Sequence, residues 1–201
     1  MLEKYYENAL NDAKESLLND GVIIIPTDTV YGLACLSNSS VAIDRIYEMK
    51  KRNKDKELPI IVNSYKMLTD VISVDVELVK KLSKYFPGPL TLVCKRNPSF
   101  DYFDAETVAV RMLDVPLVNK IIESVNTPLC LTSANISNEE NICDPIELVD
   151  MFDGYIDCVF LDGKCKKVES TIVKINEDNS LTLLREGKIS FDNILKEYQN
   201  D

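Results

Sequence analysis

The sequence predicts a single α/β domain across residues 1–201, with a twisted mixed (parallel and antiparallel) sheet flanked by helices. Apolar runs of strand length interleave with helix-length amphipathic segments along the whole chain, which is typical of α/β proteins. The polar residues 176–180 separate two strand-like runs and indicate a hairpin, so the sheet combines antiparallel with parallel pairs. No repeat, low-complexity tract or shift in composition marks a linker, and 201 residues are enough for one core.

Helical spacing of apolar residues predicts the first helix, which ends before Gly21. Val22 to Ile25 are four consecutive β-branched residues and predict a buried strand, after which Pro26 begins a polar loop that extends to Leu33. Asp144 offers an N-cap, followed by a proline at the first helical position. Helices are predicted from Tyr6 to Leu18, from Ser40 towards residue 50, after Asp144, and at 64–73, 75–86, 115–125 and 190–199. The remaining strands are predicted at 58–63, 90–95, 107–111, 129–132, 156–161, 170–175 and 181–185.

The composition restricts the chemistry available to the chain. It contains no histidine and no tryptophan, and its 23 lysines and arginines against 33 aspartates and glutamates give a net charge of −10. Without histidine, Ser-His and Cys-His nucleophile pairs, imidazole acid/base catalysis and zinc sites with imidazole ligands are excluded. Any reaction must therefore use carboxylates, lysine, arginine, hydroxyls, thiols, backbone groups or a borrowed metal.

The cysteines and the N-terminal segment indicate the cellular compartment in which the protein is expected. The six cysteines are scattered without a C-x-x-C pair, and several lie in apolar runs, so we expect reduced thiols in the core. The N-terminal segment carries charges where a signal peptide needs an apolar region, and no stretch approaches the roughly 18 apolar residues of a membrane span. A cytoplasmic protein without a membrane contact is therefore expected. The cysteines are Cys35, Cys94, Cys130, Cys143, Cys158 and Cys165.

Residues 50–56 concentrate five of the 23 cations, namely Lys50, Lys51, Arg52, Lys54 and Lys56. Two interpretations stay open. The cluster is either a solvated helix end, whose cations complement the helix dipole, or a binding patch for a small polyanion such as a nucleotide. A long nucleic acid would meet repulsion from the acidic surface around so short a patch.

Two predicted strands are followed by loops of small polar residues, and ligands of α/β proteins bind at strand ends. Thr27 and Thr29 follow the first of these strands and can hydrogen-bond a small substrate. Considered alone, the same loop is an ordinary turn in which Asp28 bonds its own backbone. Ser133 to Ser137 follow a later strand and supply hydroxyl and amide groups that orient a ligand, with no histidine to activate a nucleophile.

Arginines end two other predicted strands. Arg111 and Arg185 are each either a surface charge or a planar clamp for a carboxylate or phosphate. The sequence motifs of P-loop, dinucleotide-binding and zinc-protease sites are absent. Asp101, Asp104 and Glu106 form an acidic stretch for which a solvated loop is favoured over a metal site.

In these segments the sequence closely resembles the YrdC-like family of L-threonylcarbamoyladenylate synthases, in its short, single-domain form. The matching segments occur in the family's order over about residues 10–190. They are PTDTVYGL at 26–33, Lys50-Lys51-Arg52, FPGPLTLV at 86–93, VAVRM at 108–112, TSANIS at 132–137, STIV at 170–173 and Arg185-x-Gly187. The resemblance implies an α/β domain whose twisted mixed sheet surrounds a concave, positively charged cavity.

The resemblance also implies a reaction and its site. L-threonine, bicarbonate or CO₂, and ATP with Mg²⁺ would give threonylcarbamoyl-AMP and pyrophosphate, for the machinery that forms threonylcarbamoyladenosine at position 37 of transfer RNA. The implied threonine contacts are Thr27, Tyr31, Arg111, Ser133 and Ser170, with Arg111 pairing the carboxylate. The implied ATP contacts are Lys50, Arg52, Lys56, Thr107, Asn135 and Arg185, of which Lys50 and Arg52 are the expected catalytic residues. No metal site made by the protein alone is expected.

The sequence departs from the family pattern in four places. Asn53 and Glu57 stand where the family often has prolines, Asn138 replaces a glycine, and Glu186 lies where Arg-Pro-Gly is common. None of these changes removes an implied ligand contact. The loop at 50–57 is expected to be more flexible than usual, with an acid beside the phosphate site.

Other functions stay open at this point. A module that binds double-stranded RNA or transfer RNA without synthase activity is suggested by the family's concave basic face, although the net charge of −10 disfavours more than a weak RNA contact. A carbamoyl-transfer module of larger hydrogenase-maturation or O-carbamoylating enzymes is expected to need further domains that 201 residues do not hold. An α/β domain of unrelated function is the third alternative.

Overall fold

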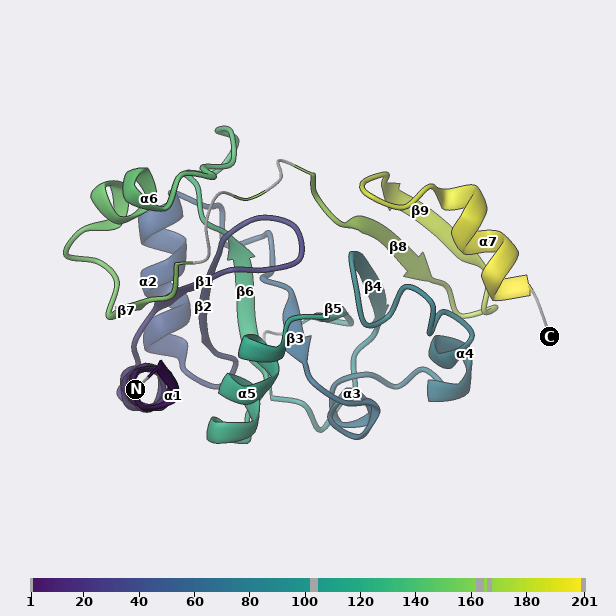
Figure 1. The fold of residues 1–201 in the computed structure, drawn as a ribbon. Helices are drawn as coiled ribbons and strands as arrows, with labels where there is room; N and C mark the ends of the chain where they lie inside the picture. The colour runs from purple at the N-terminus through teal and green to yellow at the C-terminus, as the bar shows by residue number, and fades with distance from the viewer. Residues whose placement is uncertain (1, 102–104, 162–164, 166–167, 200–201) are drawn as a thin grey trace.

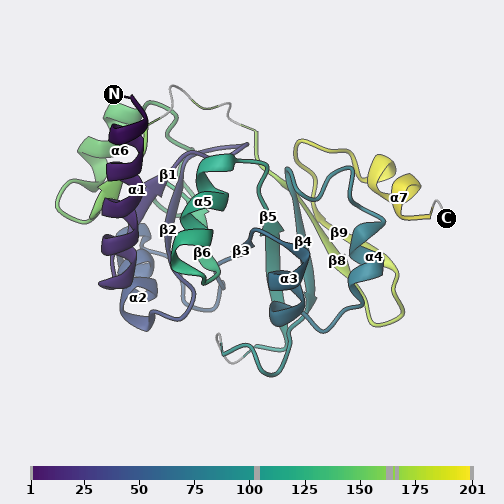
Figure 2. The same ribbon diagram turned by 60° about the horizontal axis from the view of Figure 1, so that its bottom comes forward.

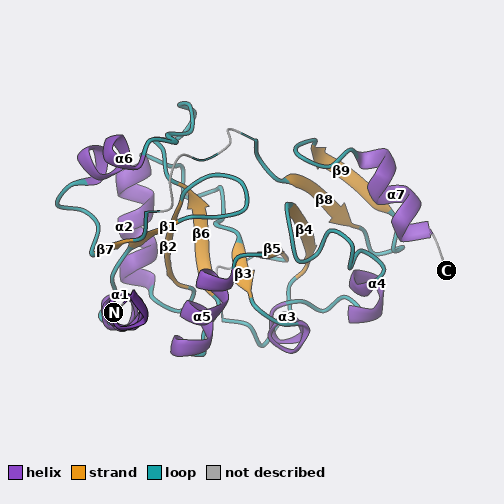
Figure 3. Cartoon of the chain, in the orientation of Figure 1, coloured by secondary structure: helices purple, strands orange, loops and turns teal. Residues whose placement is uncertain are grey.

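The computed structural model describes residues 2–101, 105–161, 165 and 168–199. In this part of the chain nine strands form one sheet in the order β7-β1-β2-β6-β3-β5-β4-β8-β9, drawn in orange in Figure 3. The strands are β1 (Ile23–Ile25), β2 (Gly32–Leu36), β3 (Ile60–Val62), β4 (Leu90–Lys95), β5 (Thr107–Met112), β6 (Leu129–Ser133), β7 (Cys158–Val159), β8 (Thr171–Ile175) and β9 (Leu181–Arg185). The helices, labelled in Figure 1, are α1 (Leu2–Leu18), α2 (Ser40–Lys50), α3 (Tyr65–Val71), α4 (Val76–Lys80), α5 (Pro116–Val125), α6 (Pro145–Phe152) and α7 (Phe191–Gln199).

The predicted mixed α/β architecture is confirmed. The β1–β2, β2–β6, β3–β6, β4–β5 and β8–β9 pairs are antiparallel, whereas the β1–β7, β3–β5 and β4–β8 pairs are parallel. Residues 176–180 form the predicted hairpin turn, which is closed by a bond of 2.9 Å from the Asn176 N–H to the Ser180 carbonyl. No helix of the described residues is long and apolar enough to cross a membrane.

Strand β2 corrects the sequence prediction, which treated residues 27–33 as one polar loop. Gly32 already belongs to the strand, and a Cβ there would lie 3.0 Å from the Leu131 side chain, so the glycine lets β2 approach β6 closely. The segment has little local strand propensity because it lacks β-branched residues. Its pairing with β1 on one side and β6 on the other stabilises it.

Helix α4 is shorter than the predicted helix at 75–86. Beyond Lys80 the chain continues in tight turns, in which the N–H of Leu82 bonds the carbonyl of Val79 (2.9 Å) and that of Tyr85 bonds the carbonyl of Leu82 (2.8 Å). Pro87 disfavours a helical conformation for the residue before it, which is one reason why the helix does not reach residue 86.

Alternate residues of the strands face two cores, one on each side of the sheet. On β1, Ile24 packs in the core that includes residues of α2 and α6, whereas Ile23 and Ile25 pack in the core that includes residues of α1 and α5. Figures 1 and 2 show α1 and α5 beside β1, β2 and β6, and α7 at the β8–β9 end of the sheet. The α1–α5 face is therefore covered by these helices at one end of the sheet.

The cysteines correct a second prediction. Cys35, Cys94 and Cys130 are buried free thiols, as expected. Cys143 and Cys165 instead form a disulfide, with Cα atoms 4.8 Å apart. Nothing in their spacing of 22 residues indicated a pair, because two loops come side by side only in the folded chain. The inference of a cytoplasmic location from six reduced thiols loses part of its basis.

Candidate active site

A cavity of about 200 Å³ lies on the α1–α5 face of the sheet. Ile61 and Arg111 face it from the paired strands β3 and β5, whereas Ile60 and Val110 point into the opposite core. Strands and strand-end loops supply its walls. The residues that line it are Thr27, Thr29, Val30, Tyr31, Arg52, Pro59, Ile61, Thr91, Ala109, Arg111, Leu131, Thr132, Ser133, Glu169, Ser170, Ile172 and Arg185.

Seven of the residues implied by the sequence motifs line this one cavity. They come from segments between residues 27 and 185, so the fold brings distant parts of the chain together. The implied residues Lys50, Lys56, Thr107 and Asn135 are not among the lining residues. The seven are Thr27, Tyr31, Arg52, Arg111, Ser133, Ser170 and Arg185.

Arg111 forms one end of the cavity and is held on several sides. Its Nε donates to the Gly88 carbonyl (3.0 Å), its Nη1 to Thr29 Oγ1 (3.3 Å) and its Nη2 to Asp28 Oδ1 (2.5 Å). Gly88 has φ +144°, a conformation that favours glycine, and this turn aims its carbonyl at Arg111. Burial lowers the pKa of Arg111 below its usual value, and the charge of Asp28 opposes this shift.

Thr27 organises the loop between β1 and β2. Its hydroxyl donates to the Val30 carbonyl (2.5 Å) and accepts from the N–H groups of Thr29 (3.1 Å) and Val30 (3.2 Å). The carbonyl of the buried Tyr31 accepts from the Ala134 N–H (2.8 Å), which ties this loop to the end of β6. Thr27 therefore shapes the loop as well as lining the cavity.

Lys50, Asn135 and Ser133 form a network behind the cavity wall. Lys50, which is 1% exposed, donates from Nζ to the carbonyls of Ser133 (2.5 Å) and Asn135 (2.7 Å) and to Asn135 Oδ1 (3.0 Å). Ser133 Oγ donates to the same Asn135 Oδ1 at 2.7 Å. An ammonium group has three N–H donors, and these acceptors take all three. The geometry therefore gives no support to a direct contact of Lys50 with ATP and assigns it to holding the loop that carries Ser133.

The opposite wall comes from β4, β8 and β9. Parallel pairing of β4 with β8 brings Thr91 Oγ1 to 3.0 Å from Ser170 Oγ. Arg185 Nη2 donates to the carbonyl (3.0 Å) and the hydroxyl (3.3 Å) of Ser170. Arg185 Nη1 also pairs with Glu169 at 2.8 Å, with the two side chains 40% and 42% exposed. This arginine therefore lies at the solvent-accessible edge of the cavity.

Arg52 lines the cavity from the loop that follows α2. Its Nε donates to the Lys56 carbonyl and its Nη2 to the Glu57 carbonyl, both at 2.9 Å, so the loop closes around its own arginine. Lys54 pairs with Asp44 on the surface at 2.5 Å, and the Lys56 side chain is exposed. The cations at 50–56 therefore divide between the interior, the cavity and the surface, and neither interpretation of the cluster holds for all of them.

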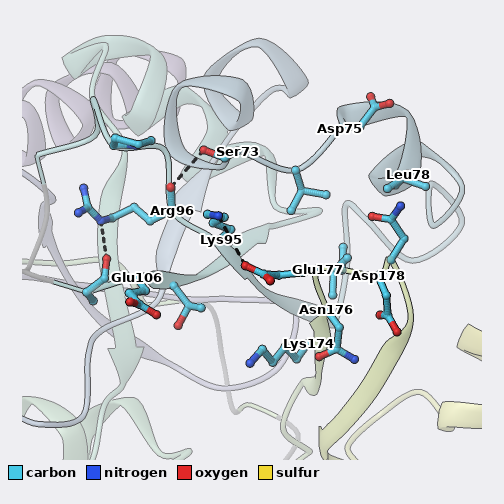
Figure 4. A pocket seen from close by; sticks show the side chains of 16 residues that line it. Ser73, Asp75, Leu78, Lys95, Arg96, Glu106, Lys174, Asn176, Glu177 and Asp178 are labelled. Carbon is cyan, nitrogen blue, oxygen red and sulfur yellow. Dashed lines mark hydrogen bonds and ion pairs between the residues drawn. The ribbon is translucent and has the colours of Figure 1, made fainter.

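Thr107 lies in a different pocket. It begins β5, four residues before Arg111, which corresponds to roughly 13 Å along a strand. The pocket that it lines has a volume of about 1260 Å³ and is surrounded by charges of both signs (Figure 4), including the pair Lys95–Glu177 at 3.6 Å. The structure therefore does not bring Thr107 together with the other implied ATP contacts.

Sequence reasoning missed several residues that shape the cavity. Asp28 was interpreted as a turn residue, although it lies inside the PTDTVYGL segment and pairs with Arg111. Thr29 was predicted as a hydroxyl for a small substrate but was left out of the contacts that the resemblance implies, and it lines the cavity. Thr91 gave a weak signal, as a polar residue in an apolar strand. Glu169 gave none, because its contact depends on how Arg185 on β9 approaches the segment before β8.

Among the described residues, the side chains at the cavity do not fit a magnesium site formed by the protein. The described part of the chain has no group of three or more acidic or cysteine side chains placed to hold a metal ion. Glu169, which lines the cavity, and Asp28, which lies behind Arg111, are each paired with an arginine. Asp104 of the acidic stretch lies outside the described residues. Mg²⁺ therefore stays an expectation only as part of the substrate Mg-ATP.

The mixed sheet flanked by helices, with a small cavity that three arginines help to line, defines an α/β protein whose cavity has the charge to attract a small anionic molecule. The chain belongs to the Sua5/YciO/YrdC family, whose model, described as "Telomere recombination", matches residues 15–187. This confirms the family resemblance found in the sequence motifs.

Relatives cover most of this chain. A protein of Methanocaldococcus jannaschii is 32% identical over 189 residues, which are 93% of this chain and 89% of that protein. The threonylcarbamoyl-AMP synthase of Pyrococcus abyssi is 34% identical over 180 residues, which are 87% of this chain and 53% of that protein. The chain therefore spans about half the length of the Pyrococcus relative.

Solved structures support the same assignment. The P. abyssi Sua5 structure complexed with L-threonine has a TM-score of 0.84 and 32% identity, over 94% of this chain and 56% of that chain. The E. coli YciO structure has a TM-score of 0.82 over 94% of this chain and 92% of that chain. Its identity of 22% supports the fold alone.

Proposed function

We propose that this chain is an L-threonylcarbamoyladenylate synthase, which makes threonylcarbamoyl-AMP and pyrophosphate from L-threonine, bicarbonate or CO₂, and ATP. The observation that carries the proposal is the convergence of Arg52, Arg111 and Arg185 with the hydroxyls of Ser133 and Ser170 on one cavity. The synthase names of relatives in Pyrococcus abyssi and Bacillus subtilis, and the Pyrococcus structure with L-threonine, support it.

The size and the exposure of the cavity suggest where threonine and ATP each bind. Its volume of about 200 Å³ is below the roughly 300–1,000 Å³ of pockets for drug-sized ligands and suits one amino acid. Arg111 at the buried end is the proposed partner of the threonine carboxylate. Arg52 and Arg185 are the proposed partners of the ATP phosphates. Arg185 lies at the exposed edge of the cavity and leaves room for the nucleotide outside, and Arg52 lines the same cavity.

The proposed reaction needs positioning and positive charge more than a protein nucleophile. The amine of threonine adds to CO₂ and loses a proton, which gives a carbamate. A carbamate oxygen then attacks the α-phosphorus of ATP while the bond to pyrophosphate breaks. Arginine N–H groups stabilise the charge that builds up on the phosphates, and the serine hydroxyls orient the substrate. A chain without histidine can supply all of these groups.

The setting of the reaction is part of the proposal. Threonylcarbamoyl-AMP is an activated acyl donor, and we expect the machinery that modifies transfer RNA to consume it in the cytoplasm. A binding module for structured RNA is not favoured, because the cavity is of amino-acid size and the chain carries a net charge of −10.

The direct test incubates the protein with Mg-ATP, labelled bicarbonate and L-threonine. Pyrophosphate and labelled threonylcarbamoyl-AMP should appear together, and omission of threonine should abolish both. Equal labelling with serine, or with no amino acid, would contradict the proposed substrate.

A further inference from the structure

Asp28 and Arg111 form the most enclosed ion pair among the described residues. Their side chains are 14% and 7% exposed, whereas Glu169 and Arg185 at the cavity edge are 42% and 40% exposed. Charges that are shielded from water interact more strongly than charges at a surface. The Asp28–Arg111 pair is therefore able to fix the orientation of a guanidinium group at the buried end of the cavity.

The hydrogen bonds of Arg111 leave donors for a ligand. A guanidinium has five N–H groups, and the acceptors Gly88, Thr29 and Asp28 take one each from Nε, Nη1 and Nη2. One N–H remains on each terminal nitrogen. Arg111 therefore keeps N–H donors that can bind an anionic group such as a carboxylate.

Asp28 is itself held in place behind the arginine. The hydrogen bonds of Thr27 fix the turn that contains it, and Lys188 Nζ donates to its carbonyl at 3.4 Å. Asp28 does not line the cavity, so it acts on a ligand through Arg111. Its Oδ2 is enclosed and receives no hydrogen bond from the described residues. Because burying an unpaired carboxylate oxygen is unfavourable, the stability of the fold alone does not explain an aspartate here.

We infer that Asp28 is a positioning residue for amino-acid binding, which orients Arg111 so that its remaining N–H groups face the α-carboxylate of the substrate. The inference rests on the proposed function. Without Asp28 the guanidinium keeps its bonds to Gly88 and Thr29 but loses its charged partner on Nη2. Binding of the amino acid then weakens, whereas the ATP contacts at Arg52 and Arg185 stay in place.

The test compares Asp28→Asn, which keeps an acceptor oxygen without the charge, with Asp28→Ala, which removes both. Asp44→Asn is the matched control, because Asp44 forms an exposed pair with Lys54 away from the cavity. KM for threonine, KM for ATP and kcat are measured by pyrophosphate release, and folding is checked by thermal unfolding. Asp28→Ala should raise KM for threonine at least about tenfold and Asp28→Asn by a smaller factor, with KM for ATP changed less than about twofold. Asp44→Asn should change neither.

An unchanged KM for threonine in folded Asp28→Ala, or equal rises in both KM values, would overturn the inference. If Asp28→Ala does not fold, Asp28→Asn decides by the same criterion. If the wild-type protein releases no threonine-dependent pyrophosphate, the proposed function fails, and calorimetric binding of L-threonine then tests the inference separately. Weaker binding by Asp28→Asn than by wild type supports it. Equal binding, or no binding by wild type, contradicts it.

Discussion

At the scale of single residues, the donor count of a cation decides its role in this site. Lys50 and Arg52 lie two positions apart on the same basic segment. The ammonium of Lys50 meets three acceptors and has no donor left, whereas Arg52 uses two of its five N–H groups on loop carbonyls. Arg52 can therefore support its loop and still bind a phosphate.

Replacement of Arg52 by alanine should reduce pyrophosphate release at least about tenfold, which corresponds to about 1.4 kcal/mol of transition-state stabilisation. The reason is the loss of a cation that lines the cavity. Lys54→Ala, at an exposed cation of the same loop, is the matched control and should leave turnover unchanged. Unchanged turnover in a folded Arg52→Ala variant would remove Arg52 from the proposed role.

Lys50 should make the stability of the fold depend on pH. Burial, and secondarily the charge of Arg52, lower its pKa from 10.5 to about 7 in the folded chain. Between these two values the unfolded chain binds more protons, so the contribution of Lys50 to the free energy of unfolding rises with pH from about 7 to 10.5. Below pH 7 the penalty for burying the charge is fully present.

Urea unfolding of the wild type and of Lys50→Met at pH 7 and pH 9 measures this contribution. The variant loses the hydrogen bonds that Lys50 donates, and it should also lack the part of the pH slope that comes from the titration of Lys50. Equal slopes in the two proteins would show that Lys50 keeps an ordinary pKa.

At the scale of secondary structure, elements with local signals were predictable from the sequence. Ser39 and Asp144 cap α2 and α6 by accepting hydrogen bonds from Ala42 N–H (3.1 Å) and Ile146 N–H (3.0 Å). These contacts span two or three residues, so they can be read along the chain. Strand β2 depends on its two neighbouring strands, so it was not recoverable from local pattern. Pro87 was a local signal that the helix predicted at 75–86 should end earlier, whereas the tight turns after Lys80 had no such signal.

Gly187 controls the approach of the segment after β9 to the segment before β8. A Cβ at this position would lie 2.4 Å from the Glu169 carbonyl oxygen and 2.5 Å from the Ser170 carbonyl carbon, both backbone atoms. Gly187→Ala should therefore displace Ser170 and lower kcat/KM by about tenfold, since small shifts of positioning groups are costly.

Gly154→Ala is the comparison for Gly187→Ala. Its Cβ would meet nothing within 4 Å, but its φ of +75° makes alanine unfavourable by about 1 kcal/mol. This variant should lose stability and keep kcat/KM. Equal kinetic losses in the two variants would indicate a general effect of backbone strain.

The disulfide Cys143–Cys165 joins the loop after β6 to the segment before β8, and both lead to cavity residues. Closing a loop of about 22 residues in the unfolded chain corresponds to roughly 3 kcal/mol in the chain-entropy model. Reduction with dithiothreitol should therefore lower Tm by several degrees, and the double variant Cys143→Ser, Cys165→Ser should show the lowered Tm without reductant. Titration of two additional thiols would show that the disulfide has been reduced. An unchanged Tm after this reduction would contradict a stabilising role of the disulfide.

At the scale of the whole molecule, the sequence motifs contain most of the residues that line the cavity. The order of the strands in the sheet decides which residues of these motifs come together. Arg111 and Thr107 belong to one strand, but opposite ends of that strand lie at different pockets. A linear motif shows that both residues are near β5 and does not show which end faces the ligand. The burial of Lys50 was likewise hidden, because its acceptors Ser133 and Asn135 lie more than 80 residues away in sequence.

The distribution of charge over the molecule favours a small anion over a nucleic acid as the ligand of the cavity. The formal net charge is −10, and two of the cations, Lys50 and Arg111, are buried and hydrogen-bonded, so they contribute little to the surface. The cations left at the cavity are surrounded by an acidic exterior, which repels a long polyanion but admits a nucleotide.

Fluorescence anisotropy with generic double-stranded RNA at 50 and 200 mM salt should show no binding tighter than about 10⁻⁴ M and no steep salt dependence. The same RNA should not inhibit pyrophosphate release, whereas free pyrophosphate should compete with ATP. Tight, salt-sensitive RNA binding that ATP displaces would instead show that the cavity arginines serve a nucleic-acid surface.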